Sequence, residues 1–227
     1  MTLPGEAGVR SYPSALLRSR LRTRRGSGQR IAVVHSPQPI PPPAPLTRLR
    51  RKAAAAARSR GGLGTGVRVA IGADHGGFEL KIKLVSVLRT MGCVVADLGA
   101  HTPEPCDYPA IGAKVATAVA SGTFDRGVLV CKSGIGIAIV ANKVPGVRAA
   151  VCHDRFDAEY SRRHNDANVL VLGAEKIAPR RAVELLKIWF ETAFESGGRH
   201  ERRVKQIQRL ERKLCANAPS RTPTGRN

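Results

Sequence analysis

The sequence predicts an α/β fold: a three-layer, Rossmann-like, doubly wound sheet of five parallel strands, followed by a protruding C-terminal helix. Three observations predict it. Between residues 67 and 196, five short aliphatic runs alternate with segments of helical spacing, which is the order that βαβ units produce. The runs are apolar almost throughout, as strands are when helices cover both faces of a sheet. The chain has 227 residues, enough for one such domain and a long extension.

The strands are expected at residues 67–73, 93–98, 127–131, 147–152 and 169–172. The helices are expected at residues 78–91, 108–121, 135–142, 155–163, 179–194 and 201–214. In the first helix, apolar residues recur at helical spacing at Phe78, Ile82, Val85 and Leu88. Lys81, Lys83 and Arg89 are expected on its opposite, solvent-facing side. The last helix has only a narrow apolar stripe, Val204, Ile207 and Leu210, which suits a helix that lies against a partner.

The basic charge of the chain is concentrated at its ends. The formal net charge is +21, and residues 1–66 hold 13 basic residues and one acidic residue, a local net of +12. Eight of the 15 prolines also lie there, so this segment is predicted to be a disordered extension. It could be dispensable, a targeting peptide or an arm that binds nucleic acid. The folded body is expected at residues 67–214, and residues 215–227 are expected to form a disordered tail.

Composition excludes several classes of protein. No apolar run is long enough to span a membrane. The five cysteines form no C-x-x-C pair, which speaks against a disulfide framework or a zinc ribbon and favours a reducing compartment. Aromatic residues make up 4%, few for stacking single-stranded bases. The sequence therefore predicts a cytoplasmic protein, with organelle targeting by the N-terminal segment as the alternative.

The turns that follow strands are the places to look for a ligand site, because open parallel sheets bind ligands at the carboxyl ends of their strands. After the first strand come Asp74, His75 and two glycines; after the third comes the turn Cys131-Lys132-Ser133-Gly134-Ile135-Gly136. That turn suits a small anion or an oxyanion. It does not suit a dinucleotide, because Ile139 stands where G-x-G-x-x-G has its third glycine.

Cys131 is the sharpest candidate for chemistry. A helix N-terminus and a neighbouring Lys132 both lower the pKa of a thiol, so Cys131 could be a nucleophile or a proton shuttle. The alternative is that it simply ends a buried strand, as Cys93 and Cys152 are expected to do.

The other candidates carry structural alternatives as well. His75 and His164 lie in polar loop sequence, whereas His35, His101 and His153 are expected at the surface. Asp74 could cap the following helix. Arg199 and Arg203 stand at i, i+4 and could clamp a phosphate, or they could form a solvated basic face.

Several motifs in order resemble the type B ribose-5-phosphate isomerases, a family that includes galactose- and allose-6-phosphate isomerases. These motifs are GADHGGFELK from Gly72, DYP from Asp107, CKSGIGIAIVANK from Cys131, GVR from Gly146, SRRHNDANVL from Ser161 and GGRHERRV from Gly197. The resemblance spans residues 67–212 approximately.

The resemblance implies an aldose–ketose isomerase that needs no metal and no cofactor and acts through a cis-enediolate, with ribose 5-phosphate and ribulose 5-phosphate as the preferred pair. It implies that Cys131 is the base, that His164 opens the furanose ring, and that Ser133 helps to stabilise the enediolate oxygen. The remaining residues implied to bind substrate are Asp74, His75, Tyr108, Gly134, Ile135, Gly136, Ile137, Asn165, Arg199 and Arg203. It also implies a homodimer or a dimer of dimers, with active sites shared across the subunit interface.

Two residues depart from the family pattern. Lys132 stands where members usually have glycine, and Glu175 falls where many carry a phosphate-binding arginine. A carboxylate cannot bind phosphate, so Lys176 or another cation is expected to substitute.

Three alternatives remain open: a hexose-6-phosphate isomerase, a non-catalytic sugar-phosphate-binding protein on the same fold, and a nucleic-acid-binding protein. The last is the weakest, since the basic ends lack aromatic residues and a recognition element.

Overall fold

The computed structural model describes residues 66–217 and confirms the predicted five-stranded, all-parallel α/β fold. All but one residue of the predicted N-terminal extension, and residues 218–227 of the predicted tail, lie outside the described residues. Among the helices of residues 66–217, none has both the length and the apolar character needed to cross a bilayer.

The sheet has the strand order β2-β1-β3-β5-β4. Its strands are β1 (Arg68–Ala73), β2 (Val94–Asp97), β3 (Arg126–Cys131), β4 (Ala149–Val151) and β5 (Val169–Gly173). The three central strands are buried almost completely, whereas the edge strands β2 and β4 are partly exposed. The edge strands are also shorter than predicted, since only four residues of β2 and three of β4 pair with a neighbour.

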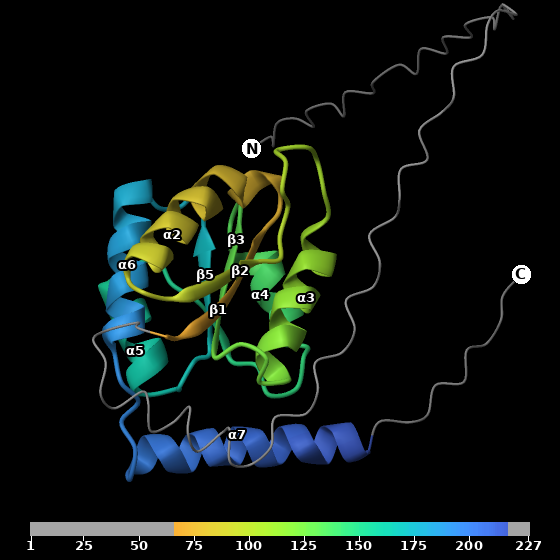
Figure 1. The fold of residues 1–227 in the computed structure, drawn as a ribbon. Coiled ribbons are helices and arrows are strands. Elements are labelled where there is room, and N and C mark those ends of the chain that lie inside the picture. Colours follow the sequence, from red (N-terminus) through yellow and green to blue (C-terminus); the bar gives the residue numbers. More distant parts are fainter. Residues whose placement is uncertain (1–65, 218–227) are drawn as a thin grey trace, which may run out of the picture. The chain divides into compact units, whose positions relative to one another are not determined.

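Helices cover both faces of this sheet (Figure 1). The helical elements are η1 (His75–Gly77), α2 (Phe78–Thr90), α3 (Tyr108–Ala120), α4 (Ile135–Ala141), α5 (Arg155–Arg163), α6 (Pro179–Glu191) and α7 (Arg199–Ala216). One core lies under α2, α5 and α6 and the other under α3 and α4. Because side chains alternate along a strand, Val130 points into the first core and Cys131 into the second.

The predicted orientation of α2 is wrong in part. Ile82 is exposed, and the buried face consists of Leu80, Leu84 and Leu88 together with Lys81, which is 1% exposed. Lys81 can be buried because its ammonium reaches the Asp97 carboxylate at 2.6 Å and also bonds the carbonyl of Ala100. A buried charge of this kind needs such partners.

Two helix ends also differ from the prediction. α6 ends at Glu191, because Thr192 adopts an extended conformation. α7 continues to Ala216, so Cys215 and Ala216 belong to a helix and not to the predicted tail. A proline, Pro219, stands two residues beyond the cap at Asn217, where prolines commonly follow helices. Along α7, Val204 is buried whereas Ile207 and Leu210 are exposed, so the predicted stripe is only partly covered within one chain.

Candidate active site

The turn after β3 holds the thiol of Cys131. This residue is the last of β3 and is 4% exposed, and the Gly134 N–H donates a hydrogen bond of 3.1 Å to its Sγ. Gly134 has φ +81°, a conformation that glycine adopts without strain. The Ile135 N–H donates to Ser133 Oγ at 3.3 Å. The turn therefore directs the Gly134 N–H to the sulfur, and the Ile135 N–H holds the hydroxyl of Ser133.

The turn after β1 lies beside it. β1 and β3 are neighbours, but the chain leaves β1 toward β2 on the other side, so the two turns flank the topological switch point of the sheet. Asp74 Oδ1 accepts a 3.0 Å hydrogen bond from the Gly77 N–H, the capping role foreseen as its structural alternative. His75 Nδ1 lies 3.3 Å from the backbone nitrogen of Cys106 and 3.2 Å from its carbonyl oxygen.

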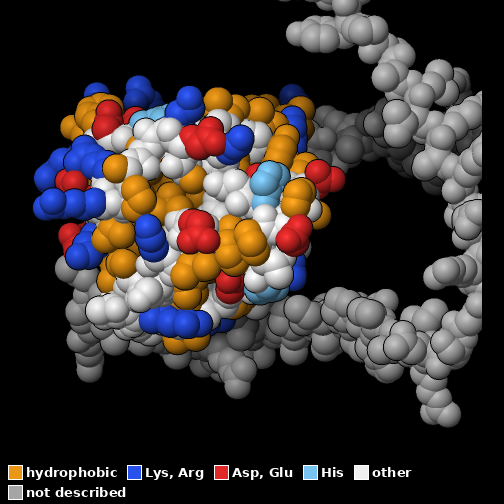
Figure 2. Space-filling view, turned by 90° about the horizontal axis from the view of Figure 1, so that it is seen from above, with side chains coloured by type: hydrophobic (Ala, Val, Ile, Leu, Met, Phe, Trp, Pro, Cys, Tyr) orange, Lys and Arg blue, Asp and Glu red, His pale blue; other side chains and the backbone are white. Residues whose placement is uncertain are grey.

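Tyr108 joins this group from the start of α3. A Cβ at Gly136 would lie 2.7 Å from Tyr108 Cζ, so the absence of a side chain at Gly136 lets the ring pack on α4. We call the group at this edge the C-terminal half-site; its members are Asp74, His75, Tyr108, Cys131 and residues 133–137. Figure 2 looks down on this edge of the sheet, where acidic, basic and histidine side chains lie among apolar ones.

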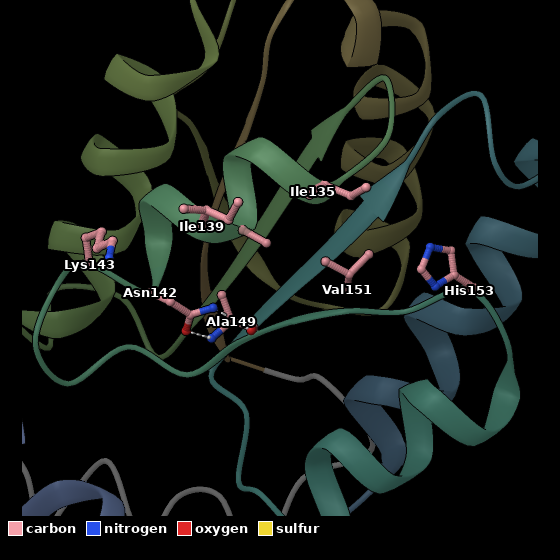
Figure 3. Close-up of a pocket in the computed structure, with 8 residues that line it drawn as sticks. Ile135, Ile139, Asn142, Lys143, Ala149, Val151 and His153 are labelled. Atoms are coloured by element: carbon pink, nitrogen blue, oxygen red, sulfur yellow. Dashed lines mark hydrogen bonds between the residues drawn. The ribbon is translucent and has the colours of Figure 1, made fainter. Parts of the chain in front are cut away.

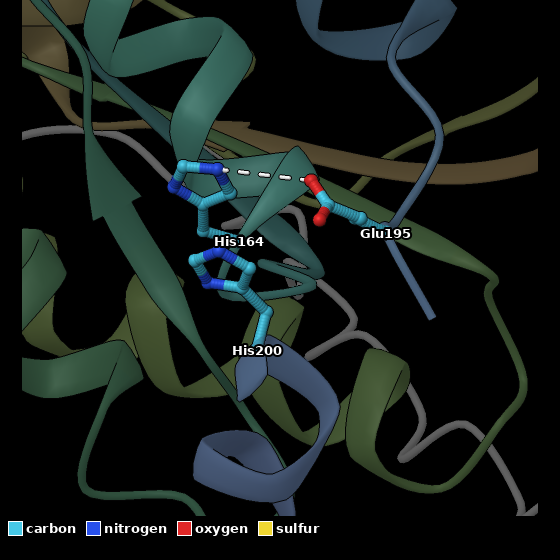
Figure 4. A group of neighbouring side chains, drawn as sticks. All are labelled: His164, Glu195 and His200. Atoms are coloured by element: carbon cyan, nitrogen blue, oxygen red, sulfur yellow. Dashed lines mark ion pairs between the residues drawn. The ribbon is translucent and has the colours of Figure 1, made fainter. Parts of the chain in front are cut away.

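A second group surrounds His164, the residue that caps α5. Its ring stacks on that of His200 at 3.8 Å between centroids and 6° between planes, and Tyr160 meets it edge-on at 4.4 Å. His164 Nε2 lies 4.0 Å from Glu195 Oε2 (Figure 4). We call His164, Asn165, Arg199, His200 and Arg203 the N-terminal half-site.

His200 links the helix cap to the predicted phosphate clamp. It is 6% exposed, and Arg199 Nε donates a 3.2 Å hydrogen bond to its Nε2. Burial lowers the pKa of His200, and the nearby His164 and Arg199 lower it further. His200 is therefore held neutral and able to accept from Arg199. The motifs quoted from the sequence include His200 and yet assign it no role; its place between two predicted binding arginines was the available signal.

Asp166 fixes the loop that carries His164. It has φ 46°, which is uncommon for a residue other than glycine, although aspartate tolerates it. Its carboxylate accepts 2.8 Å hydrogen bonds from both Arg148 and Arg162. Arg162 also lies 5.3 Å from the Trp189 ring centroid, so this loop is tied to the core through the two guanidinium groups.

The two half-sites lie at opposite ends of the parallel strands: the C-terminal half-site lies where the strands end, and the N-terminal half-site lies where they begin. Cys131 ends β3, whereas His164 precedes the start of β5, a parallel neighbour of β3. β3 has six residues, and a rise of about 3.3 Å per residue separates the edges by roughly 15–20 Å. One chain thus does not bring the predicted site residues together: Cys131, Ser133, Asp74, His75 and Tyr108 cluster at one edge, and His164, Asn165, Arg199 and Arg203 at the other.

His164, Glu195 and His200 are also the one group of potential metal ligands found within residues 66–217; their ligand atoms lie within 4.8 Å of one another. The lone pair of an imidazole lies in the plane of its ring. Because the two rings are stacked 6° from parallel, their lone pairs lie in separate, nearly parallel planes and do not converge on one ion. The arrangement resembles a stacked pair more than a metal centre.

The remaining cysteines and histidines fall as predicted where the structure describes them. Cys93 and Cys152 are buried, and burial raises the pKa of both thiols, that of Cys152 to about 12. His101 and His153 have exposed side chains, and His35 lies outside the described residues. These residues carry no sign of a second thiol or imidazole site.

The site places a thiol and backbone N–H donors at the switch point of a doubly wound parallel sheet, where α/β proteins of this architecture bind their ligands. A sequence model of the family described as Ribose/Galactose Isomerase matches residues 69–207. The chain belongs to this family and is an isomerase, which confirms the resemblance drawn from its motifs.

Individual relatives and a solved structure to which the chain is similar are also named as sugar-phosphate isomerases. The chain is 42% identical over 147 residues to a protein of Listeria innocua named ribose-5-P isomerase B, covering 65% of this chain and 99% of the relative. It is 42% identical over 131 residues to the D-erythrulose-4-phosphate isomerase of Pectobacterium atrosepticum, covering 57% of this chain and 86% of the relative. The structure of Clostridium thermocellum ribose-5-phosphate isomerase B is similar, with a TM-score of 0.63 and 46% identity over 65% of this chain and 99% of that one.

Proposed function

We propose that the protein interconverts ribose 5-phosphate and ribulose 5-phosphate without a cofactor. The observation that carries the proposal is the position of Cys131: a buried sulfur that accepts the Gly134 N–H at 3.1 Å, at the switch point of the sheet. Relatives named ribose-5-phosphate isomerase B support the choice of substrate.

The proposed reaction is a proton transfer between adjacent carbons. The Cys131 thiolate takes the proton from C2 of the open-chain aldose, which leaves a cis-enediolate. The hydroxyl proton on O2 then passes to O1, and the resulting thiol returns a proton to C1, so that C2 becomes the carbonyl of the ketose. Helix geometry leaves the N–H groups of Gly136 and Ile137 without an acceptor in the preceding turn. These groups and the Ser133 hydroxyl stabilise the negative charge on the enediolate oxygen.

The N-terminal half-site supplies the rest of the chemistry. His164 opens the furanose ring as a general acid–base, Asn165 contacts the sugar, and Arg199 and Arg203 bind the phosphate together with His75. In the C-terminal half-site, Asp74 keeps one carboxylate oxygen for the sugar hydroxyls, because its other oxygen caps η1. Tyr108 lines the pocket.

A complete site then requires two copies of the chain, one presenting Cys131 and the other His164. The surface next to the C-terminal half-site suits a second copy: Ile135 and Ile139 on α4 are 58% and 57% exposed. They line an apolar groove with Ala149 and Val151 of the edge strand β4 (Figure 3). We propose a homodimer, or a dimer of dimers, assembled over this surface and over the exposed stripe of α7.

The decisive experiment measures ribulose 5-phosphate formed from ribose 5-phosphate in the presence of EDTA. Cys131→Ala should lower kcat by about 100- to 10,000-fold, the usual contribution of a general base. Cys215→Ser, at an exposed thiol near the end of α7, is the matched control and should leave kcat unchanged. A folded wild-type protein that does not turn over this pair would refute the pentose assignment.

Substrate length is the second question for the same assay. One relative is named for a four-carbon phosphate, and the family description includes galactose. Four-, five- and six-carbon aldose phosphates should therefore be compared at equal concentration. Binding of these phosphates without turnover would favour the non-catalytic alternative.

A further inference from the structure

Lys132 lies beside the C-terminal half-site. It directly follows Cys131, and its stem lies over the turn after β1: a Cβ at Gly76 would be 2.9 Å from Lys132 Cγ. Its Nζ lies 3.3 Å from Oε1 of Glu175, in the loop after β5. The Lys132 side chain therefore runs from the turn that carries His75 to Glu175, where its ammonium is held.

The backbone fixes Glu175 in this position. The Glu175 N–H donates to the Lys132 carbonyl at 3.0 Å, and the Ala174 N–H donates to the Cys131 carbonyl at 2.8 Å. Gly173 packs so closely that a Cβ there would be 2.6 Å from the Ser133 carbonyl oxygen. Because these contacts tie the loop to the end of β3, the backbone of Glu175 is held in place and its carboxylate lies within reach of Lys132.

The ion pair between Lys132 and Glu175 contributes too little to the stability of the fold to explain its presence. The side chains of Lys132 and Glu175 are 65% and 60% exposed, and ion pairs at such exposure contribute about 0–1 kcal/mol. An ammonium has three donors, so a single carboxylate oxygen leaves it able to bind an anion. The members of the C-terminal half-site otherwise include an acid, Asp74, and no lysine or arginine.

We propose that Lys132 binds the phosphate of the substrate in the C-terminal half-site and that Glu175 positions its ammonium for this contact. The proposal rests on the proposed function and adds two residues to it. Lys132 thereby supplies from this edge a cation for a dianion that Arg199 and Arg203 of a second copy bind from the other side.

The test uses Lys132→Met, which keeps the stem on Gly76 and removes the charge, with Lys83→Met on the exposed side of α2 as the control. Loss of one charged hydrogen bond should raise the KM for ribose 5-phosphate about tenfold or more, with kcat nearly unchanged. The inhibition constant of inorganic phosphate should rise in parallel. Lys83→Met should change neither.

Glu175→Gln separates positioning from direct contact. It should raise the KM about threefold in the wild-type background and have no effect in the Lys132→Met background, because the two residues act as one unit. An unchanged KM and phosphate inhibition constant in Lys132→Met would overturn the proposal. So would a fall in kcat with a shifted pH–rate profile, since Lys132 would then act on Cys131.

Failure of the proposed function would look different. A wild-type protein inactive on every aldose phosphate refutes the isomerase reaction, but stabilisation by inorganic phosphate in a thermal unfolding assay still reports on Lys132. In that case, a smaller phosphate-induced rise in Tm for Lys132→Met than for Lys83→Met supports the contact, and equal rises contradict it.

Discussion

Mixing two inactive variants should restore activity, because the two half-sites of one chain cannot meet. The variants are Cys131→Ala, which removes the proposed base at the C-terminal edge, and His164→Asn, which removes the proposed ring-opening group at the other. The edges are separated by roughly 15–20 Å according to the length of β3, far beyond the reach of one pentose phosphate. Each variant alone therefore lacks one group in both sites of its dimer.

The magnitude follows from counting sites. If subunits reassort at random after unfolding and refolding together, about half of the dimers contain one copy of each variant. Such a dimer has one site with both defects and one site with neither, so the mixture should recover about a quarter of the wild-type kcat per total protein.

The assay is ribulose 5-phosphate formation by each variant alone and by an equimolar refolded mixture. A mixture of Cys131→Ala with Cys131→Ser is the matched control and should recover nothing, since both lack the base. Recovery no greater than the sum of the two variants, in a sample shown by light scattering to be dimeric, would refute the shared site. A wild-type enzyme that is monomeric at working concentration and fully active would refute it as well.

Three further predictions concern stability and pH. Gly134→Ala should lower the free energy of unfolding by about 1–2 kcal/mol, measured in urea, because alanine at a positive φ is strained and its Cβ would lie 3.1 Å from Val151 Cγ1; an unchanged midpoint would contradict this. Lys81→Met should lower the free energy of unfolding by about 2 kcal/mol, because it leaves the Asp97 carboxylate and the Ala100 carbonyl without their buried partner; a neutral or stabilising effect would show that Asp97 is satisfied by solvent. Because the pKa of His200 is lowered in the fold, the unfolded chain binds this proton first as pH falls below 6.5, so stability should decline over that range. Thermal unfolding followed between about pH 7.5 and 5.5 should show a smaller decline for His200→Asn than for wild type; equal declines would exclude His200 as the cause.

The architecture could be predicted from sequence because each strand of a sheet covered on both faces is an unbroken apolar run. The orientation of α2 could not, since Lys81 is buried through contacts with residues 16 and 19 positions away. Helical spacing treats such a lysine as solvent-facing; only the tertiary position of Asp97 and Ala100 decides otherwise.

The candidate site was predicted as a set of residues shared between two subunits, but which residues belong to which half was not predicted. The order of the chain contains the signal: Cys131 is the last residue of a strand and His164 comes before one, and in a parallel sheet these are opposite edges. No role was predicted for His200, because its ring stacks on that of His164, a residue 36 positions away in the sequence. Such a tertiary contact leaves no local sequence pattern.

The clamp of Asp166 by Arg148 and Arg162 has a consequence for the choice of denaturant. The loop that carries His164 is held by guanidinium–carboxylate pairs of 2.8 Å, and free guanidinium ions compete for the same carboxylate geometry. Guanidinium chloride well below the unfolding midpoint should therefore release this loop and abolish turnover while the apolar cores stay intact. Urea, which is uncharged, should inactivate the protein only as the sheet unfolds, so the two denaturants would distinguish local from global loss of structure.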